Sequence, residues 1–232
     1  MASENISPAR RQRRRAAGDR HDDADVRSGI WVVHAMQDPR RIALLGDLRH
    51  EHFYYTEGDP SVDRVDYWVP RVTTTLDRAG DRPIAFDAIV TLIDGNRECR
   101  RVASRNLDQS VEADAHLLER LGAAARRHGG KMIEVTPEQL DQHATRVWNW
   151  VRVLGAHKRA RDHSLAVVEA SVLARISYGV ARNVGELLTA LPSDAPALIL
   201  ASLAKLLRQR RLCSDLDRAT WSRSTKVWGA PQ

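Results

Sequence analysis

Residues 86–103 read FDAIVTLIDGNRECRRVA, and this stretch decides the fold that we expect for the chain. Two runs of strand-forming residues stand on either side of Asp94-Gly95, a dipeptide that favours a tight hairpin turn. Asp87 stands at the start of the first run. The stretch therefore predicts a β-hairpin with a carboxylate at the beginning of its first strand.

The segments before the hairpin follow less regular patterns. Residues 1–29 are polar and rich in Arg, Asp and Ala, so we expect a disordered basic tail there. Residues 42–45 and 48–55 suit a helix, although residues 52–55 would equally suit a strand. Two further strands are predicted at residues 65–69 and 72–76.

The segments after the hairpin have clearer boundaries. Apolar residues at helical spacing predict a helix over residues 111–128, and residues 131–135 read as a short strand. Thr136 is a good N-cap, followed by Pro and by Gln139 at the capping-box position, so a helix should run from there toward residue 154. Residues 30–157 thus predict an α/β domain whose mixed sheet is flanked by helices.

Residues 158–232 form the second predicted domain. Three helical segments precede two short segments that suit paired strands, in the order 165–176, 184–191, 196–209, 212–216 and 224–228. Three helices followed by a two-stranded wing are typical of a winged helix-turn-helix domain.

Composition narrows the classes of function. The net charge of +6 and the isoelectric point near 9.8 favour a polyanionic partner, and residues 9–15 (ARRQRRR) concentrate part of that charge. Two cysteines give no disulfide framework. The sequence has neither an apolar run of membrane-spanning length nor an apolar signal segment, so we expect a cytoplasmic protein without a membrane partner.

At this point the chain resembles TnsA, the endonuclease subunit of heteromeric bacterial transposases, over residues 44–228. The resemblance rests on short phrases in a shared order: YWVPR at 67–71, FD at 86–87, DG at 94–95, EVTPE at 134–138, LCSDL at 212–216 and SRSTKV at 222–227. It implies a restriction-endonuclease-like mixed sheet followed by a winged helix. It also implies cleavage of one strand of double-stranded DNA at each transposon end, with transposase and transposition-regulator subunits as partners.

The resemblance to this family, and to PD-(D/E)xK nucleases generally, also places a metal site. Asp87 matches the strand acid that would bind Mg²⁺. The family's second-strand acid or Gln falls on Arg101, and its Lys falls on Ala103. Strand alternation puts Glu98 on the opposite face with Arg100, so Glu98 does not replace the missing acid.

The remaining ligand of the family is a helix Glu, and it falls on Arg49, with Asp47 two residues earlier and Glu51 two residues later. Glu51 is the candidate that we name as its substitute. A guanidinium near a metal position repels the cation, by about 4 kcal/mol at 4 Å for unit charges in an effective dielectric of 20. We therefore expect an impaired nuclease centre. If it is active, Asp87 and Glu51 are the catalytic candidates.

The predicted helix 196–209 carries the candidate residues for DNA binding. Its leucines supply a core face, and the polar side chains that we expect to look outward and contact DNA are Ser202, Lys205, Arg208, Gln209, Arg210 and Arg211. A winged helix can equally serve as a protein docking module.

The sequence leaves three hypotheses about function open. The first is a TnsA-like transposition protein with an impaired nuclease centre that binds DNA and partners. The second is an active metal-dependent DNA endonuclease of the same family. The third is a winged-helix transcriptional regulator that is not a nuclease.

Overall fold

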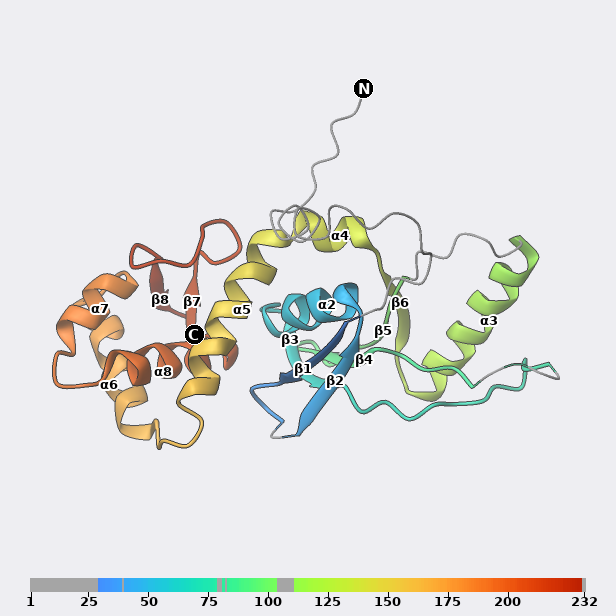
Figure 1. Cartoon of the computed structure of the whole chain (residues 1–232), viewed down its shortest axis with the longest axis horizontal. Coiled ribbons are helices and arrows are strands. Elements are labelled where there is room, and N and C mark those ends of the chain that lie inside the picture. Colours follow the sequence, from blue (N-terminus) through green and yellow to red (C-terminus); the bar gives the residue numbers. More distant parts are fainter. Residues whose placement is uncertain (1–28, 39, 79–80, 82, 104–110, 231–232) are drawn as a thin grey trace, which may run out of the picture.

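The structure is a computed structural model that describes residues 29–38, 40–78, 81, 83–103 and 111–230, without the side chains of residues 111–114 (Figure 1). The basic tail predicted for residues 1–29 lies, except for Gly29, outside the described residues.

The hairpin predicted from residues 86–103 is confirmed. Strands β4 (Ala88–Leu92) and β5 (Arg97–Val102) pair antiparallel, with Ala88 opposite Arg100. In the turn, Gly95 has a φ of 83°, a conformation that glycine adopts without steric cost. The Asp94 carboxylate accepts hydrogen bonds from the backbone N–H and the side-chain amide of Asn96, which fixes the turn.

This hairpin forms the centre of a four-stranded mixed sheet of order β3-β4-β5-β6. Strand β3 (Val62–Asp66) runs antiparallel to β4, and β6 (Lys131–Val135) runs parallel to β5. The parallel pair needs a crossover, and helix α3 (Val111–Arg127) provides it. The expected α/β class, a mixed sheet flanked by helices, is therefore confirmed.

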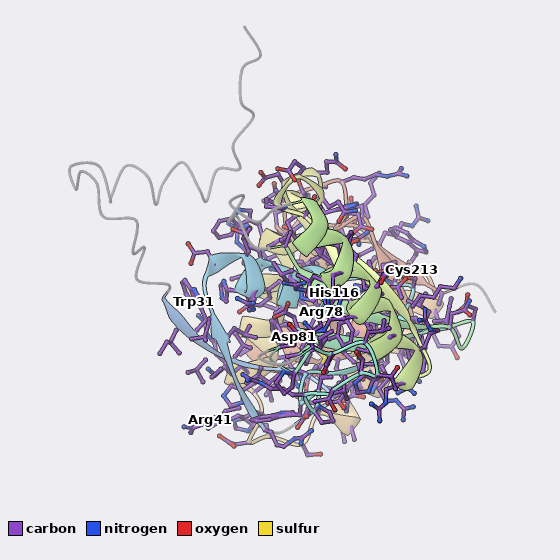
Figure 2. All side chains as sticks on the ribbon, turned by 90° about the vertical axis from the view of Figure 1, so that its right-hand side faces the viewer. Trp31, Arg41, Arg78, Asp81, His116 and Cys213 are labelled. Atoms are coloured by element: carbon purple, nitrogen blue, oxygen red, sulfur yellow. The ribbon has the colours of Figure 1, made fainter. Side chains whose placement is uncertain are left out.

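Helix α3 covers one face of this sheet. Cys99 of β5 packs there against Leu121, Ala124 and Ala125. The extended segment before the hairpin contacts this helix: His116 Nε2 lies 3.1 Å from the Leu76 carbonyl oxygen, and Arg120 Nε lies 3.4 Å from Asp81 Oδ2 (Figure 2 labels His116 and Asp81).

The strand predicted at residues 72–76 is wrong. Only an isolated bridge between Val72 and Ile84 forms there. The reason is local: the Asp77 carboxylate accepts hydrogen bonds from the backbone N–H and the hydroxyl of Thr74, at 3.0 and 2.7 Å, so these groups turn the chain.

A second hairpin precedes the sheet. Strands β1 (Ile30–His34) and β2 (Arg41–Leu45) pair antiparallel and lead into helix α2 (Asp47–Glu57). The helix prediction for residues 42–45 is wrong, because burial alternates along β2, with Ile42 and Leu44 inside. The helix prediction for residues 48–55 is confirmed, and the strand alternative for residues 52–55 is wrong.

The predicted helix start at Thr136 is also confirmed. Thr136 and Gln139 form a complete capping box at the start of α4 (Pro137–Gln142). The helix expected to run toward residue 154 is divided at His143, and α5 (Ala144–Arg159) continues beyond it.

The C-terminal part has the helices and strands expected from the pattern. Helices α6 (Ala166–Ser177), α7 (Val184–Ala190) and α8 (Pro196–Arg208) precede strands β7 (Leu212–Ser214) and β8 (Val227–Gly229), which pair antiparallel. In the part of the chain that the structure describes, no helix combines the length and apolar character needed to cross a membrane.

Helix α5 joins the two parts of the molecule. It packs against α2 on one side and against α8 on the other, so the predicted boundary at residues 157/158 falls in its last turn. One hydrophobic core contains Phe53 of α2, Trp150 and Val153 of α5, and Leu203 of α8. The two parts therefore share a core.

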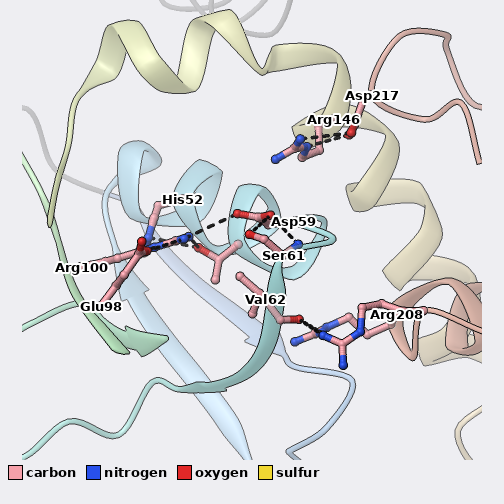
Figure 3. Close-up of polar contacts among 11 residues, drawn as sticks. His52, Asp59, Ser61, Val62, Glu98, Arg100, Arg146, Arg208 and Asp217 are labelled. Carbon is pink, nitrogen blue, oxygen red and sulfur yellow. Dashed lines mark hydrogen bonds and ion pairs between the residues drawn. The ribbon is translucent and has the colours of Figure 1, made fainter. Parts of the chain in front are cut away.

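A buried ion pair reinforces this junction. Arg208 Nε, at the end of α8, donates to Glu57 Oε2 at 3.2 Å, and the two side chains are only 3% and 2% exposed. Tyr67 Oη donates to the other Glu57 oxygen at 3.0 Å. Arg208 Nη1 donates to the Val62 carbonyl at 3.2 Å, as Figure 3 shows. Each charge is thus neutralised and hydrogen-bonded, as a buried ion pair requires.

We expect Arg208→Met to lower the free energy of unfolding by about 3–5 kcal/mol, because Glu57 would remain buried without its counter-ion. Urea denaturation of the full chain measures this loss. Arg211→Met is the matched control, since Arg211 is exposed three residues later. Equal costs for the two substitutions would contradict the structural role given to Arg208.

Candidate functional site

Asp87 lies immediately before β4, where the hairpin meets α2. Its Oδ1 atom accepts a hydrogen bond from Arg49 Nε at 2.5 Å, and its Oδ2 atom accepts one from the Val102 backbone N–H at 2.7 Å. The side chain is 15% exposed. Both carboxylate oxygens are therefore bound by groups of the protein itself.

Arg49 lies in the first turns of α2, at the position where the resemblance places a metal-binding Glu. Its Nη1 atom also donates to the Leu45 carbonyl at 3.2 Å, which holds the guanidinium at the start of the helix. The structure thus brings the expected helix position and the strand acid together, but with a cation in place of a carboxylate. The Arg49 guanidinium therefore neutralises the Asp87 carboxylate.

Sequence reasoning misses this ion pair. The resemblance places Arg49 where the family has a metal-binding Glu, and from the sequence this indicates only that a ligand is missing. The two residues are 38 positions apart, so no local sequence signal identifies the pair.

Glu51 occupies different surroundings. Two residues along a helix turn the side chain by about 200°. Glu51 accordingly lines a cavity with Trp31 and Tyr54, whereas Arg49 points to Asp87. The structure therefore does not place the two candidate catalytic carboxylates around a common point.

The second strand of the hairpin contributes a further cation. The predicted alternation is confirmed, because Cys99 faces α3 and Arg100 faces α2. Arg100 is buried, and its Nε donates to Glu98 Oε2 at 2.8 Å (Figure 3). It also lies 3.5 Å from Asp59 and donates to the Thr56 hydroxyl at 3.3 Å. Glu98 is therefore engaged by Arg100.

These residues do not fit a Mg²⁺ ion. Such an ion needs several oxygen ligands, usually including carboxylates. Within the described ranges, no group of three or more His, Cys, Asp or Glu side chains could hold a metal. Asp87 instead faces Arg49, and the positions aligned with the family's second acid and Lys hold Arg101 and Ala103.

The structure also places the six candidate DNA-binding residues. The outward orientation expected for Ser202 and Arg208 is wrong, because both side chains are buried. Helix α8 lies between α5 and α6, so its polar side chains also contact other parts of the protein. Lys205 pairs with Glu169 at 2.6 Å, and Arg210 pairs with Asp63 at 2.6 Å. The exposed members of the set are Gln209 and Arg211.

His52, on α2, is buried near the Arg49 and Arg100 side chains. Its Nε2 atom lies 3.1 Å from the Thr56 hydroxyl. Burial, followed by repulsion from Arg100, lowers the pKa of His52 from 6.5 to about 4. The imidazole therefore stays neutral in the folded protein at pH values where an unfolded histidine binds a proton.

Because the folded-state pKa of His52 lies below the unfolded value, we expect its contribution to stability to be lost as pH falls from about 6.5 to about 4. The loss amounts to about 3 kcal/mol in the free energy of unfolding. His52→Gln should remove this part of the pH dependence, and the exposed His163→Gln should retain it. Urea denaturation between pH 7 and pH 4 measures the difference. Equal pH profiles for wild type and His52→Gln would contradict the assignment.

Comparisons with known proteins do not assign the chain to a family. No protein-family model matches the sequence, and the search of curated proteins gives no significant match.

Proposed function

We propose that the chain is a TnsA-like, DNA-binding subunit of a transposition complex whose nuclease centre is impaired. It acts on double-stranded transposon-end DNA together with transposase and regulator subunits. The observation that carries the proposal is the location of positive charge. Residues 158–232 hold 12 Lys and Arg against six Asp and Glu, whereas residues 1–157 hold 24 of each. The five arginines of residues 9–15 are offset by acidic residues elsewhere in residues 1–157, so the C-terminal part has a net charge of +6 by itself, which favours contact with a polyanion there.

The arrangement of the C-terminal elements supports a winged helix. An isolated bridge pairs Asn183 with Lys226, so the segment before α7 lies beside the segment that leads into β8. The Val227 backbone N–H also donates to the Arg182 carbonyl at 3.0 Å. Three short extended segments thus accompany α6, α7 and α8, in the order typical of this domain.

Because the polar residues Ser202 and Arg208 of α8 are buried, we place the proposed DNA contact on another surface. The loop between β7 and β8 is fastened to α5, because Asn149 Nδ2 donates to the carbonyls of Leu216 and Ala219 at 2.6 and 2.8 Å. Arg211, Arg223 and Lys226 are exposed at the end of α8 and along this loop. A fixed loop with exposed cations suits contact with phosphates.

The impaired nuclease centre follows from the ion pair at Asp87. Metal-assisted hydrolysis needs carboxylates to hold the ion beside the scissile phosphate. The Arg49 guanidinium lies against the aligned carboxylate instead. It can neutralise negative charge, but it cannot activate water as a metal does.

A surface for a protein partner lies on the β1–β2 hairpin. The outward face carries the cross-strand pairs Ile30–Leu45 and Val32–Ala43, and Ile30, Val32 and Leu45 are more than half exposed. A contiguous exposed apolar face favours a protein contact. This supports assembly with a partner subunit.

We expect Arg211→Gln/Arg223→Gln/Lys226→Gln to weaken binding to a 30-base-pair duplex by about tenfold or more, because three phosphate contacts are removed. The salt dependence of the binding constant should also fall by about two to three units of log–log slope. Fluorescence anisotropy at several salt concentrations measures both.

The matched control is Arg71→Gln/Arg126→Gln/Lys131→Gln, which removes three exposed charges from the α/β part. Its binding should remain near that of the wild type. Equal losses in the two triple variants would contradict a DNA surface on the C-terminal part. Metal-dependent nicking of the duplex by the wild type would favour the active endonuclease instead.

A further inference from the structure

A cavity of about 310 Å³ lies between β1, α2 and the α4–α5 helices. Trp31, Tyr54 and Trp148 supply aromatic walls, and Glu51 and Asp141 supply carboxylates. The volume lies at the lower end of the range for ligand pockets, about 300–1,000 Å³. The site belongs neither to the Asp87 ion pair nor to the proposed DNA surface.

The lining of this cavity suits a cation. Trp31 and His50 stack with ring centroids 4.0 Å apart, and Tyr54 meets His50 edge-on at 4.9 Å. Aromatic faces attract cations, and nearby carboxylates add electrostatic attraction. A guanidinium is the preferred guest of such a site, because it stacks on aromatic rings and gives up its hydration more readily than an ammonium.

We propose that this cavity is the docking site of the chain's own arginine-rich segment, residues 9–15. This segment holds five arginines. The described chain begins at Gly29, two residues before Trp31 in the cavity wall, so residues 9–15 are joined to the site by a short stretch of chain. The 16 residues from Arg15 to Trp31 would span about 20–24 Å as a coil, which gives a high effective concentration at the cavity.

The docking gives the arginine-rich segment a regulatory role, which rests on the proposed DNA-binding function. Five arginines in a free segment would add phosphate contacts to any DNA complex. In the docked state, the guanidinium groups that enter the cavity contact Glu51, Asp141 and the aromatic rings and are withheld from DNA. DNA and the cavity therefore compete for the same segment.

Trypsin tests the docking directly in the full chain, because it cleaves after arginine. We expect Glu51→Gln/Asp141→Asn to accelerate cleavage within residues 9–15 by about fivefold or more, since the undocked segment is accessible to the protease throughout. Mass spectrometry of the intact chain follows the cuts. Far-UV circular dichroism and the urea midpoint establish that each variant is folded.

The matched control is Glu119→Gln/Glu134→Gln, which removes two exposed carboxylates elsewhere and should leave the cleavage rate unchanged. Wild-type rates in the cavity variant, or equal acceleration in both variants, would overturn the proposal. So would quenching of tryptophan fluorescence by an added ARRQRRR peptide without any change in tail cleavage, since the guest would then come from another molecule.

A second variant leaves the folded core untouched. Replacing all five arginines of residues 9–15 by Gln should shift the tryptophan emission, because Trp31 and Trp148 line the cavity. An emission spectrum identical to that of the wild type would overturn the docking. Neither experiment contains DNA, so a failure of docking is distinguishable from a failure of the proposed DNA binding.

Discussion

The ion pair between Glu57 and Arg208 constrains the rest of the structure. Both side chains are almost fully buried, so neither charge can be separated from the other without a penalty of several kcal/mol. The pair fixes the end of α8 to the end of α2 and to β3, through the Val62 carbonyl. Helix α8 therefore belongs to the common core, and the positive charge proposed to meet DNA lies on the segments around it.

Helix α2 carries a second carboxylate–guanidinium contact near its other end. Arg49 donates a hydrogen bond to Asp87, and Asp87 also accepts one from the Val102 backbone N–H. Asp87 therefore connects α2 with β5 at the beginning of the hairpin. The positive charge beside Asp87 thus comes from a side chain of the protein itself. Under the proposed function, this ion pair would leave the mixed sheet a role in assembly and DNA contact without metal-dependent cleavage.

Local chemistry made much of the fold predictable. The Asp94-Gly95 turn, the capping box at Thr136 and the C-terminal elements each depend on neighbouring residues, and each was found. Predictions failed where distant contacts decide. Residues 42–45 form a strand because β1 pairs with them. Arg208 points inward because it pairs with Glu57, a residue 151 positions away in the sequence. At the candidate site the sequence identified Asp87 but not its counter-ion, since pairing across α2 and the hairpin depends on the tertiary fold.

The proposed impairment of the nuclease centre requires that Asp87 pairs with Arg49 and binds no metal ion. Calorimetric titration of the full chain with Mn²⁺ tests it most directly, using wild type, Asp87→Ala and, as a control on the same hairpin, Asp94→Ala. The account predicts no difference among the three proteins and no site of millimolar or tighter affinity. Binding by the wild type and by Asp94→Ala that disappears in Asp87→Ala would contradict it and establish a working metal centre.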